Sequence, residues 1–501
     1  MTISGIGSRS ALLVQPLLDM RRQLDELQRQ LGTGKKSNTY AGIGLDRGLT
    51  VTLNNQLAAL DSQDSAMQTA GVRMSTAQTA LQQIAAVGGQ TKAAALQSRF
   101  IADGTGQTQD QRTAYSQLDI VLGLLNTQVG DRYLFSGRAV DQPAVESTDH
   151  IVNGNGVQAG LKQIISERQQ ADIGADGLGR LVIPAAAGGV VSVSEDVAGS
   201  PFGLKLAAIS SSITGAVANA PAGAPPSMSI DLSAAAPNRG ESVTFAFTLP
   251  DGTSSSVTLT ATDAAPPGPN QFTIGATPAI TANNLQSALS GAVASLVGGP
   301  MAAASAMAAA DSFFAADANN PPMRVDGPPF DTATALVAGT GSNTVIWYSG
   351  EAGSDPARAT ANVRIDSSIS VSYGMRANED ALRQAVENIA VFAATRFSAS
   401  DPNAPDAYGA LTQKIAANLD GQPGLQKISD IESDIASAQV AMQDASQRHQ
   451  LMRSSLSDLL QSIQGVPQEE VGAQILTLQT SLQASLQTTA LLLQTSLVNY
   501  L

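Results

Sequence analysis

The side chains that could perform chemistry are few in this sequence, and they are far apart. Neither of the two histidines, His150 and His449, has a second metal-binding residue three or four positions further on. Asp172 and Asp176 flank a glycine and could form either a cation site or a polar turn, and we favour the turn. His449 lies in a run of regularly spaced apolar residues, so we expect it to be a packed core histidine.

The common catalytic and cofactor motifs are absent from the sequence. There is no cysteine, which excludes disulfides, thiol catalysis and cysteine-based metal sites. The chain also lacks the His-Glu-x-x-His, Gly-x-Ser-x-Gly and phosphate-loop patterns, and the glycines at 154, 156 and 160 miss the dinucleotide-binding spacing. We therefore expect no enzyme activity, no cofactor and no metal. Trp347 and Tyr348 could form a sugar-binding face, but core packing is the interpretation we favour.

The charge balance argues against a nucleic-acid partner. The formal net charge is −14, and the 28 lysines and arginines are scattered, whereas a phosphate-binding protein needs them clustered. A local excess of basic residues between Arg9 and Lys36 fits either a solvated helix face or a binding patch. Aromatic residues make up only 4% of the chain, so we expect its stability to depend on long helices and their neighbours.

Both ends of the chain carry long helical patterns. Near the start, apolar residues alternate spacings of four and three, which is the seam of a heptad helix that should end at Gly32-Thr33-Gly34. Near the end, the segment from Val471 to Leu501 has no charged side chain, yet its apolar residues fall on one helical face. A break at Gly465-Val466-Pro467 precedes this segment. We predict an assembly seam formed by Leu13, Leu17, Met20, Leu24, Leu27, Leu31, Ile475, Leu478, Leu482, Leu486, Leu493 and Leu497.

The middle of the chain has a different texture, rich in Gly, Ala, Ser, Thr and Pro. Two alternating runs around Asp251-Gly252 predict a β-hairpin over 241–260, and further strands are expected at 228–232, 271–275, 344–349 and 362–373. Ala-rich segments at 281–297 and 301–318 predict helices, and strict heptad spacing from Ile428 to Ile463 predicts a long helical rod. The predicted fold class is α+β, a long antiparallel helical bundle formed by both chain ends with a β-rich central insertion.

These patterns predict six segments along the chain. The outer two are terminal helices for assembly, the next two form a helical rod, and the inner two are β-rich. In chain order they are 1–45, the N-terminal terminal helix; 46–140, the first part of the rod; 141–195, a β-rich connecting segment; 196–375, an outward-facing β-rich insertion; 376–465, the second part of the rod; and 466–501, the C-terminal terminal helix, which should pair with the first.

The N-terminus shows neither the basic region nor the apolar stretch of a secretory signal peptide. No run of about 18 apolar residues predicts a membrane span. If the protein acts outside the cell, we expect it to leave by a route that uses no cleaved signal.

Several short motifs resemble the flagellin family. The segment 31–36, Leu-Gly-Thr-Gly-Lys-Lys, resembles the Leu-Ser-Thr-Gly-Lys element after the first flagellin helix, and 483–486, Gln-Ala-Ser-Leu, resembles the family's C-terminal region. The motif at 133–137, Tyr-Leu-Phe-Ser-Gly, and the ending at 496–501, Ser-Leu-Val-Asn-Tyr-Leu, are similar to the hook–filament junction branch, known as hook-associated protein 3. The chain departs from the family at 40–47, where an Asp-Asp-Pro-like element is usual.

The resemblance covers roughly 1–140 and 375–501, and it implies a structural role. It implies a self-assembling subunit of the bacterial flagellum that is secreted for motility and joins the hook to the filament through its paired ends. The implied partners are copies of itself in a ring, a neighbouring hook-associated protein, flagellin and an export chaperone, with no nucleic acid. The alternatives are a filament-forming flagellin and, from another class, an adhesin or enzyme activity in the central insertion.

Overall fold

The computed structural model describes residues 4–421 and 424–498, and it describes side-chain burial from residue 14 to residue 491. The fold mixes helix and sheet, with 52% of residues in helices and 15% in strands, which agrees with the predicted α+β class. The chain divides into two compact units. Unit 1 comprises Met1–Thr69, Arg364–Val371 and Val440–Leu501, and unit 2 comprises Ala70–Val363 and Ser372–Gln439. The six segment limits expected from the sequence remain predictions.

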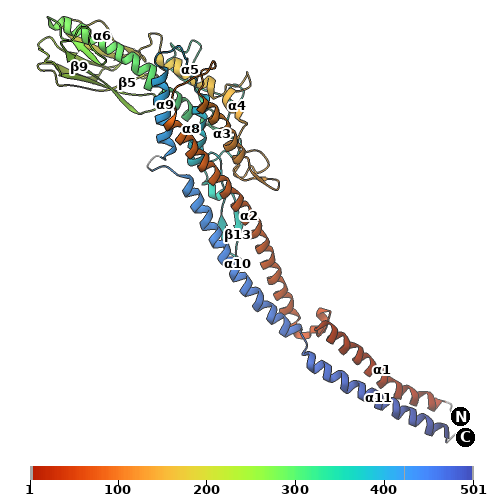
Figure 1. The fold of residues 1–501 in the computed structure, drawn as a ribbon. Coiled ribbons are helices and arrows are strands. Elements are labelled where there is room, and N and C mark those ends of the chain that lie inside the picture. Colours follow the sequence, from red (N-terminus) through yellow and green to blue (C-terminus); the bar gives the residue numbers. More distant parts are fainter. Residues whose placement is uncertain (1–3, 422–423, 499–501) are drawn as a thin grey trace. The chain divides into compact units, whose positions relative to one another are not determined.

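Unit 1 is built mainly from helices of the two chain ends (Figure 1). Its elements are α1 (Ser4–Thr33), the 3-10 helix η1 (Tyr40–Asp46), the first part of α2 (Arg47–Gln97), the last part of α10 (Ile428–Gln464) and α11 (Gln468–Val498). The predicted helix end is confirmed, because α1 stops at Thr33 and Gly34 has a positive φ of 71°. The predicted break at 465–467 is confirmed too. Pro16 lies inside α1 and does not begin it.

Within unit 1, α2 and α10 are held by apolar side chains at heptad spacing. Leu53, Leu60 and Met67 of α2 are buried, as are Met442 and Ala445 of α10. Burying such residues is the main stabilising contribution in a pair of long helices, since the helices have little tendency to persist alone in water.

Unit 2 holds the remaining helices. Their capping follows the sequence: Thr108 caps α3 with its hydroxyl and Gln111 reaches back to the Thr108 amide, which together form a capping box. The helices are α3 (Gln109–Leu125), α4 (Thr148–Asn153), α5 (Leu161–Ile173), α6 (Pro278–Leu296), the π-helical turn η2 (Val297–Met301), α7 (Ala302–Phe314), the 3-10 helix η3 (Ala357–Thr360), α8 (Asp380–Ala394) and α9 (Ala404–Leu419).

The β-rich part of unit 2 contains two four-stranded sheets. One has the order β10-β9-β8-β5 and is antiparallel except for the β10–β9 pair, and the other is antiparallel with the order β3-β4-β7-β6. Helix α6 packs on β10, β9 and β4. The strands of these sheets are β3 (Leu181–Val182), β4 (Val190–Glu195), β5 (Lys205–Ser211), β6 (Val217–Ala222), β7 (Ser227–Asp231), β8 (Ser242–Thr248), β9 (Ser254–Thr262) and β10 (Gln271–Thr273).

One continuous apolar core joins both sheets to α6, with residues from Leu181 to Ala304. The core includes Leu181, Val191 and Val193, which precede the expected insertion at 196–375. Phe245, Phe247 and Phe272 are fully buried in this core. The predicted hairpin is confirmed by β8 and β9, in which Ser242 pairs with Thr260. Its turn is fixed to α9, because Lys414 Nζ lies 2.6 Å from Asp251 Oδ2.

Short paired strands occupy the rest of unit 2 and its border. They are β1 (Gln128–Val129), β2 (Arg132–Tyr133), β11 (Met323–Val325), β12 (Leu336–Ala338), β13 (Asn362–Arg364) and β14 (Ser370–Ser372). The strand predicted at 344–349 is wrong, because only isolated bridges occur there, at Thr344 and Tyr348. Their partners, Ala159 and Val145, lie on loops, so no ladder extends from either bridge.

The segment 141–195 is not uniformly β-rich as predicted, because α4 and α5 precede β3 and β4. The apolar residues of α5 explain this difference. Leu161, Ile164 and Ile165 are buried at helical spacing, and Gly160 and Gly174 bound the helix. The apolar residues of α5 recur at the spacing of a helix. This spacing outweighs the turn-forming composition of the segment and accounts for the helix.

One helical run in the described part of the chain, Pro278–Phe314, is long and apolar enough to cross a membrane by length and composition. In its most apolar window, 61% of the residues are buried inside the protein. Core helices of soluble proteins meet the same criterion. The expectation that the chain has no membrane span therefore remains a prediction.

Candidate functional site

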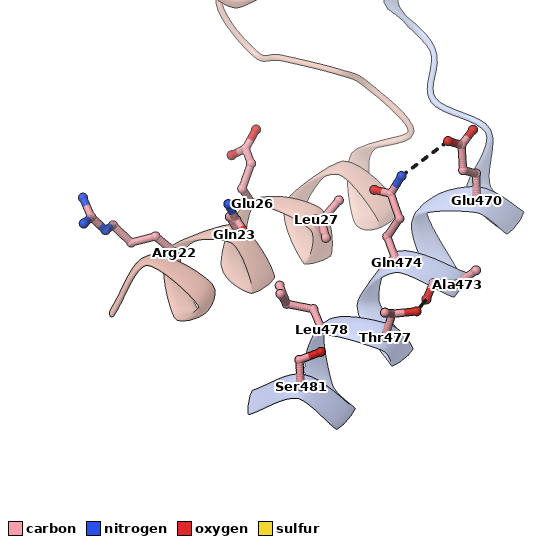
Figure 2. A pocket seen from close by; sticks show the side chains of 10 residues that line it. All are labelled: Arg22, Gln23, Glu26, Leu27, Glu470, Ala473, Gln474, Thr477, Leu478 and Ser481. Atoms are coloured by element: carbon pink, nitrogen blue, oxygen red, sulfur yellow. Dashed lines mark hydrogen bonds between the residues drawn. The ribbon is translucent and has the colours of Figure 1, made fainter. Parts of the chain in front are cut away.

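The groove between α1 and α11 in unit 1 is the candidate functional site. It has a volume of about 770 Å³ and is open along one side. Figure 2 shows the side chains that line it, with Leu27 and Leu478 on the facing helices and the polar residues around them. The helices contact each other and run in opposite directions (Figure 1). The lining residues are Arg22, Gln23, Glu26, Leu27, Glu470, Ala473, Gln474, Thr477, Leu478 and Ser481.

The residues of the predicted seam are covered to very different degrees in the single chain. On α11, Ile475 is buried, Leu478 and Leu482 are half-buried and Leu486 is 51% exposed. On α1, no seam side chain within the described range is fully buried. Half-buried are Leu17, Met20, Leu24 and Leu27, and Leu31 is exposed. The side chains of Leu13, Leu493 and Leu497 lie outside the described residues.

The uncharged back of α11 also carries exposed apolar groups. Leu476 is 66% exposed. The described part of α11 beyond Glu470 contains no charged side chain. Val14 and Leu18 of α1 are about half exposed as well. An apolar surface of this extent on a two-helix pair is typical of a segment that packs against further helices.

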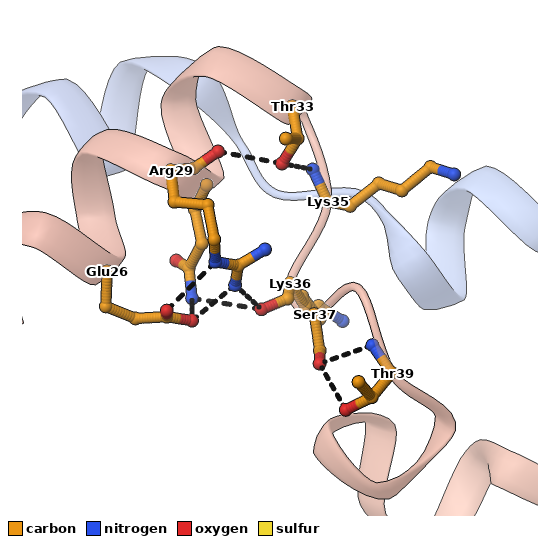
Figure 3. A network of polar contacts seen from close by, with 8 residues as sticks. Glu26, Arg29, Thr33, Lys35, Lys36, Ser37 and Thr39 are labelled. Atoms are coloured by element: carbon orange, nitrogen blue, oxygen red, sulfur yellow. Dashed lines mark hydrogen bonds and ion pairs between the residues drawn. The ribbon is translucent and has the colours of Figure 1, made fainter.

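A short backbone connection ties the two helices together at one end, beside the polar side chains at the end of α1 that Figure 3 shows. The Lys36 amide donates to the Gln464 carbonyl at 2.7 Å, and the Val466 amide donates to the Gly34 carbonyl at 3.1 Å. Side chains brace the same turn: Arg29 Nη2 donates to the Lys36 carbonyl at 3.1 Å while Arg29 Nε donates to Glu26. The hydrogen bond from Arg29 keeps the pKa of Glu26 below its usual value.

The residues weighed for chemistry are not brought together. Asp172 is buried and pairs with Arg168 at 2.8 Å, whereas Asp176 is exposed, so the two carboxylates do not converge. No group of three metal-binding side chains occurs among the described residues. His150 bonds to Glu146 and Gln158 near the surface.

The aromatic pair at 347–348 belongs to the core of unit 2. Trp347 has no exposed surface, and its Nε1 donates to the Phe314 carbonyl at 2.9 Å. Tyr348 is only 1% exposed, and burial raises the pKa of its hydroxyl. These rings cannot present a face to a sugar without local unfolding, so this pair does not support an adhesin.

One polar layer in unit 1 escaped the sequence analysis. The partly buried Asp64 of α2 and the buried His449 of α10 meet at seam positions, with Oδ1 and Nδ1 2.7 Å apart, and Arg453 donates to Asp64 Oδ2 at 2.6 Å. His449 itself was expected to pack in the core, and it is 4% exposed. The signal for its partner was present, because Asp64 continues the 53, 57, 60, 67 spacing of apolar residues.

Comparison with known proteins supplies no assignment: neither a family model nor a curated protein matches the chain. The groove leaves apolar side chains of both helices partly exposed, and the described residues hold no reactive constellation.

Proposed function

We propose that this protein is a structural subunit of the bacterial flagellum that joins the hook to the filament, in the manner of hook-associated protein 3. The observation that carries the proposal is the groove between α1 and α11, where seam residues such as Leu27 and Leu478 are only half-buried in one chain. Further helices packed on this pair would complete the burial and stabilise both ends. Assembly of several copies would supply those helices.

In this proposal the two chain ends form a long antiparallel helical bundle of the flagellin type, and the β-rich insertion faces outward. The motifs at 31–36, 133–137, 483–486 and 496–501 support the assignment to this family. The absence of charge beyond Glu470 in the last helix supports a position among other helices. The subunit acts outside the cell, where copies of it form a ring between a neighbouring hook-associated protein and flagellin.

The proposal also requires protection of the subunit before assembly. Leu476 and Leu486 would be exposed to any other apolar surface in the cytoplasm, and such surfaces associate prematurely. An export chaperone that covers α11 would prevent this. No catalytic step is needed, since the role is to transmit torque between two tubes.

The direct test is deletion of the gene. Cells that lack the protein should build hooks but release flagellin into the medium, and a plasmid copy of the full chain should restore filaments. A copy that ends before Gln468 should fail to restore them. Normal filaments on the deletion strain would refute the proposal.

A second assay separates the junction role from that of a filament-forming flagellin. If the protein has the junction role, assembly of the purified protein should stop at small rings or caps, because flagellin forms the rest of the filament. Long filaments formed by the protein alone, seen by negative-stain microscopy, would favour the flagellin alternative.

A further inference from the structure

Two surfaces of unit 1 carry unpaired charges of opposite sign beside exposed apolar side chains. The first surface, which we call the basic knob, consists of Lys35, Lys36, Leu45 and Arg47 around η1, with the exposed Asp46 as its one carboxylate. Leu45 is completely exposed, and all three basic side chains are exposed as well. Among the residues that the structure describes, none of these cations takes part in an ion pair.

The knob has a defined local structure. The Ser37 hydroxyl accepts from the Thr39 amide at 3.1 Å and contacts the Thr39 hydroxyl (Figure 3). A side chain at Gly42 would collide with Ser37, since an added Cβ would lie 2.2 Å from its hydroxyl oxygen. Gly44 has a φ of 71°, which a larger residue would adopt at a cost. Leu45 is therefore held outward by a fixed turn.

The second surface, which we call the acidic stripe, runs along α10. It consists of Val440, Asp444, Leu451 and Asp458, which are separated by four, seven and seven positions and so share one face of the helix. Val440 is 57% and Leu451 75% exposed. Within the described range neither Asp444 nor Asp458 forms a salt bridge, and the exposed Arg448, four positions after Asp444, lies at the edge of this face without an ion pair of its own.

The stripe lies on the side of α10 that faces away from its partner helix. The buried residues Met442, Ala445 and His449 occupy the opposite face, where they pack toward α2. The carboxylates and aliphatic groups of the stripe are therefore available to a second molecule without any change in the packing of unit 1.

We propose that the basic knob of one copy docks on the acidic stripe of a second copy of this chain. Lys35, Lys36 and Arg47 would meet Asp444 and Asp458, and Leu45 would cover the exposed side chain of Leu451. Charge complementarity favours this occupant, since the three cations of the knob outnumber Asp46 and the two carboxylates of the stripe outnumber Arg448, so that pairing two copies of the same surface brings like net charges together. The contact joins two different surfaces and so propagates head to tail, which closes into a ring when the rotation allows.

This inference rests on the proposed self-assembly and specifies one contact within it. The knob includes the segment 40–47, where the chain departs from the family it resembles. The contact is therefore a property of this sequence and would not be expected wherever the motifs at the ends recur.

Because the chain has no cysteine, disulfide trapping can test the contact cleanly. Full-length Leu45→Cys protein is mixed with full-length Leu451→Cys protein under mild oxidation, and the mixed dimer is quantified on non-reducing gels. The control partner is Ser62→Cys, an exposed residue of α2 outside the stripe. We expect the Leu451→Cys partner to give at least about tenfold more mixed dimer than the control, as a contact free energy near 1.4 kcal/mol would produce.

Charge reversal then asks whether the ionic groups direct the contact. Lys35→Glu with Lys36→Glu in the knob chain should reduce the mixed dimer, and Asp444→Lys with Asp458→Lys in the stripe chain should do the same. Combining the two reversed chains should restore it. Equal trapping by the Ser62→Cys control, or no restoration by the combined reversal, would overturn the inference.

The two proposals fail separately. Loss of filaments on gene deletion without trapping of the Leu45–Leu451 pair would leave the flagellar role and remove this contact. Specific trapping without any flagellar phenotype on deletion would leave the contact between copies and remove the flagellar role.

Discussion

The carboxylate of Asp64 on α2 lies 2.7 Å from Nδ1 of His449 on α10, at seam positions of the two helices. Arg453 donates to the second oxygen of the same carboxylate, so one acidic side chain has two partners. A polar layer of this kind costs desolvation energy and is favourable only while all of its members are present.

Asp64→Ala should therefore destabilise the helix pair, because it leaves His449 buried without its carboxylate partner. We expect the free energy of unfolding in urea to fall by about 3 kcal/mol. Asp61→Ala is the matched control, because Asp61 contacts the same Arg453 but is 67% exposed, and its loss should cost under about 1 kcal/mol. Equal effects of the two substitutions would show that burial of the layer contributes nothing.

Glu387 of α8 should make the stability of unit 2 depend on pH. Burial raises the pKa of its carboxyl from 4.5 to about 8, the nearby Asp311 adds to this shift, and Arg383 opposes it from 3.6 Å. The group is protonated in the fold at a pH where the unfolded chain is ionised. Its contribution is therefore fully present below pH 4.5 and is lost as pH rises toward 8, by up to about 1.4 kcal/mol per pH unit.

Glu387→Gln keeps a neutral side chain at every pH and should remove this slope. In denaturant unfolding between pH 5 and pH 9, the free energy of unfolding of the variant should increase relative to that of the wild type as pH rises. Asp311→Asn should weaken the slope without removing it, because this carboxylate is only one of the causes of the raised pKa of Glu387. A wild-type and a variant curve that run parallel over this range would contradict the assignment.

Gly137, in the motif at 133–137, should not tolerate a side chain. Its φ is 65°, and an added Cβ would lie 2.5 Å from the Glu351 carboxylate that pairs with Arg138. Gly137→Ala should lower the free energy of unfolding by about 1–3 kcal/mol. Gly71→Ala in α2 meets nothing within 4 Å and should stabilise by up to about 1 kcal/mol. Stabilisation by both substitutions would be the contrary result.

Strong periodicity made the long helices and the main hairpin predictable from the sequence. The heptad spacing fixed α10 closely, and Gly34 and Pro467 marked the ends of the segments beside α1 and α11. The alternating residues around Asp251 predicted β8 and β9 because a half-buried strand has a period of two. Each of these features is determined by residues that lie close together in the sequence.

Contacts between distant segments were not predictable in the same way. Val345, Trp347 and Tyr348 resemble a strand, yet they bury their side chains against loops and α7, and only two isolated bridges form. The partner of His449 lies 385 positions away, so the heptad spacing could place Asp64 on the seam of α2 but could not pair it with His449. The groove was predicted as a set of seam residues, but its partial coverage in one chain depends on how α1 and α11 pack.

The central claim is that the ends of the chain complete their burial by contacts between copies, and amide hydrogen exchange tests it most directly. In dilute monomer, residues 14–33 and 471–491 should exchange rapidly while α8, which is almost wholly buried, exchanges slowly. In assembled protein the same terminal amides should slow by about a hundredfold or more, the change expected for added stability near 2.7 kcal/mol. Strong protection of the terminal helices in dilute monomer, unchanged on assembly, would contradict the account.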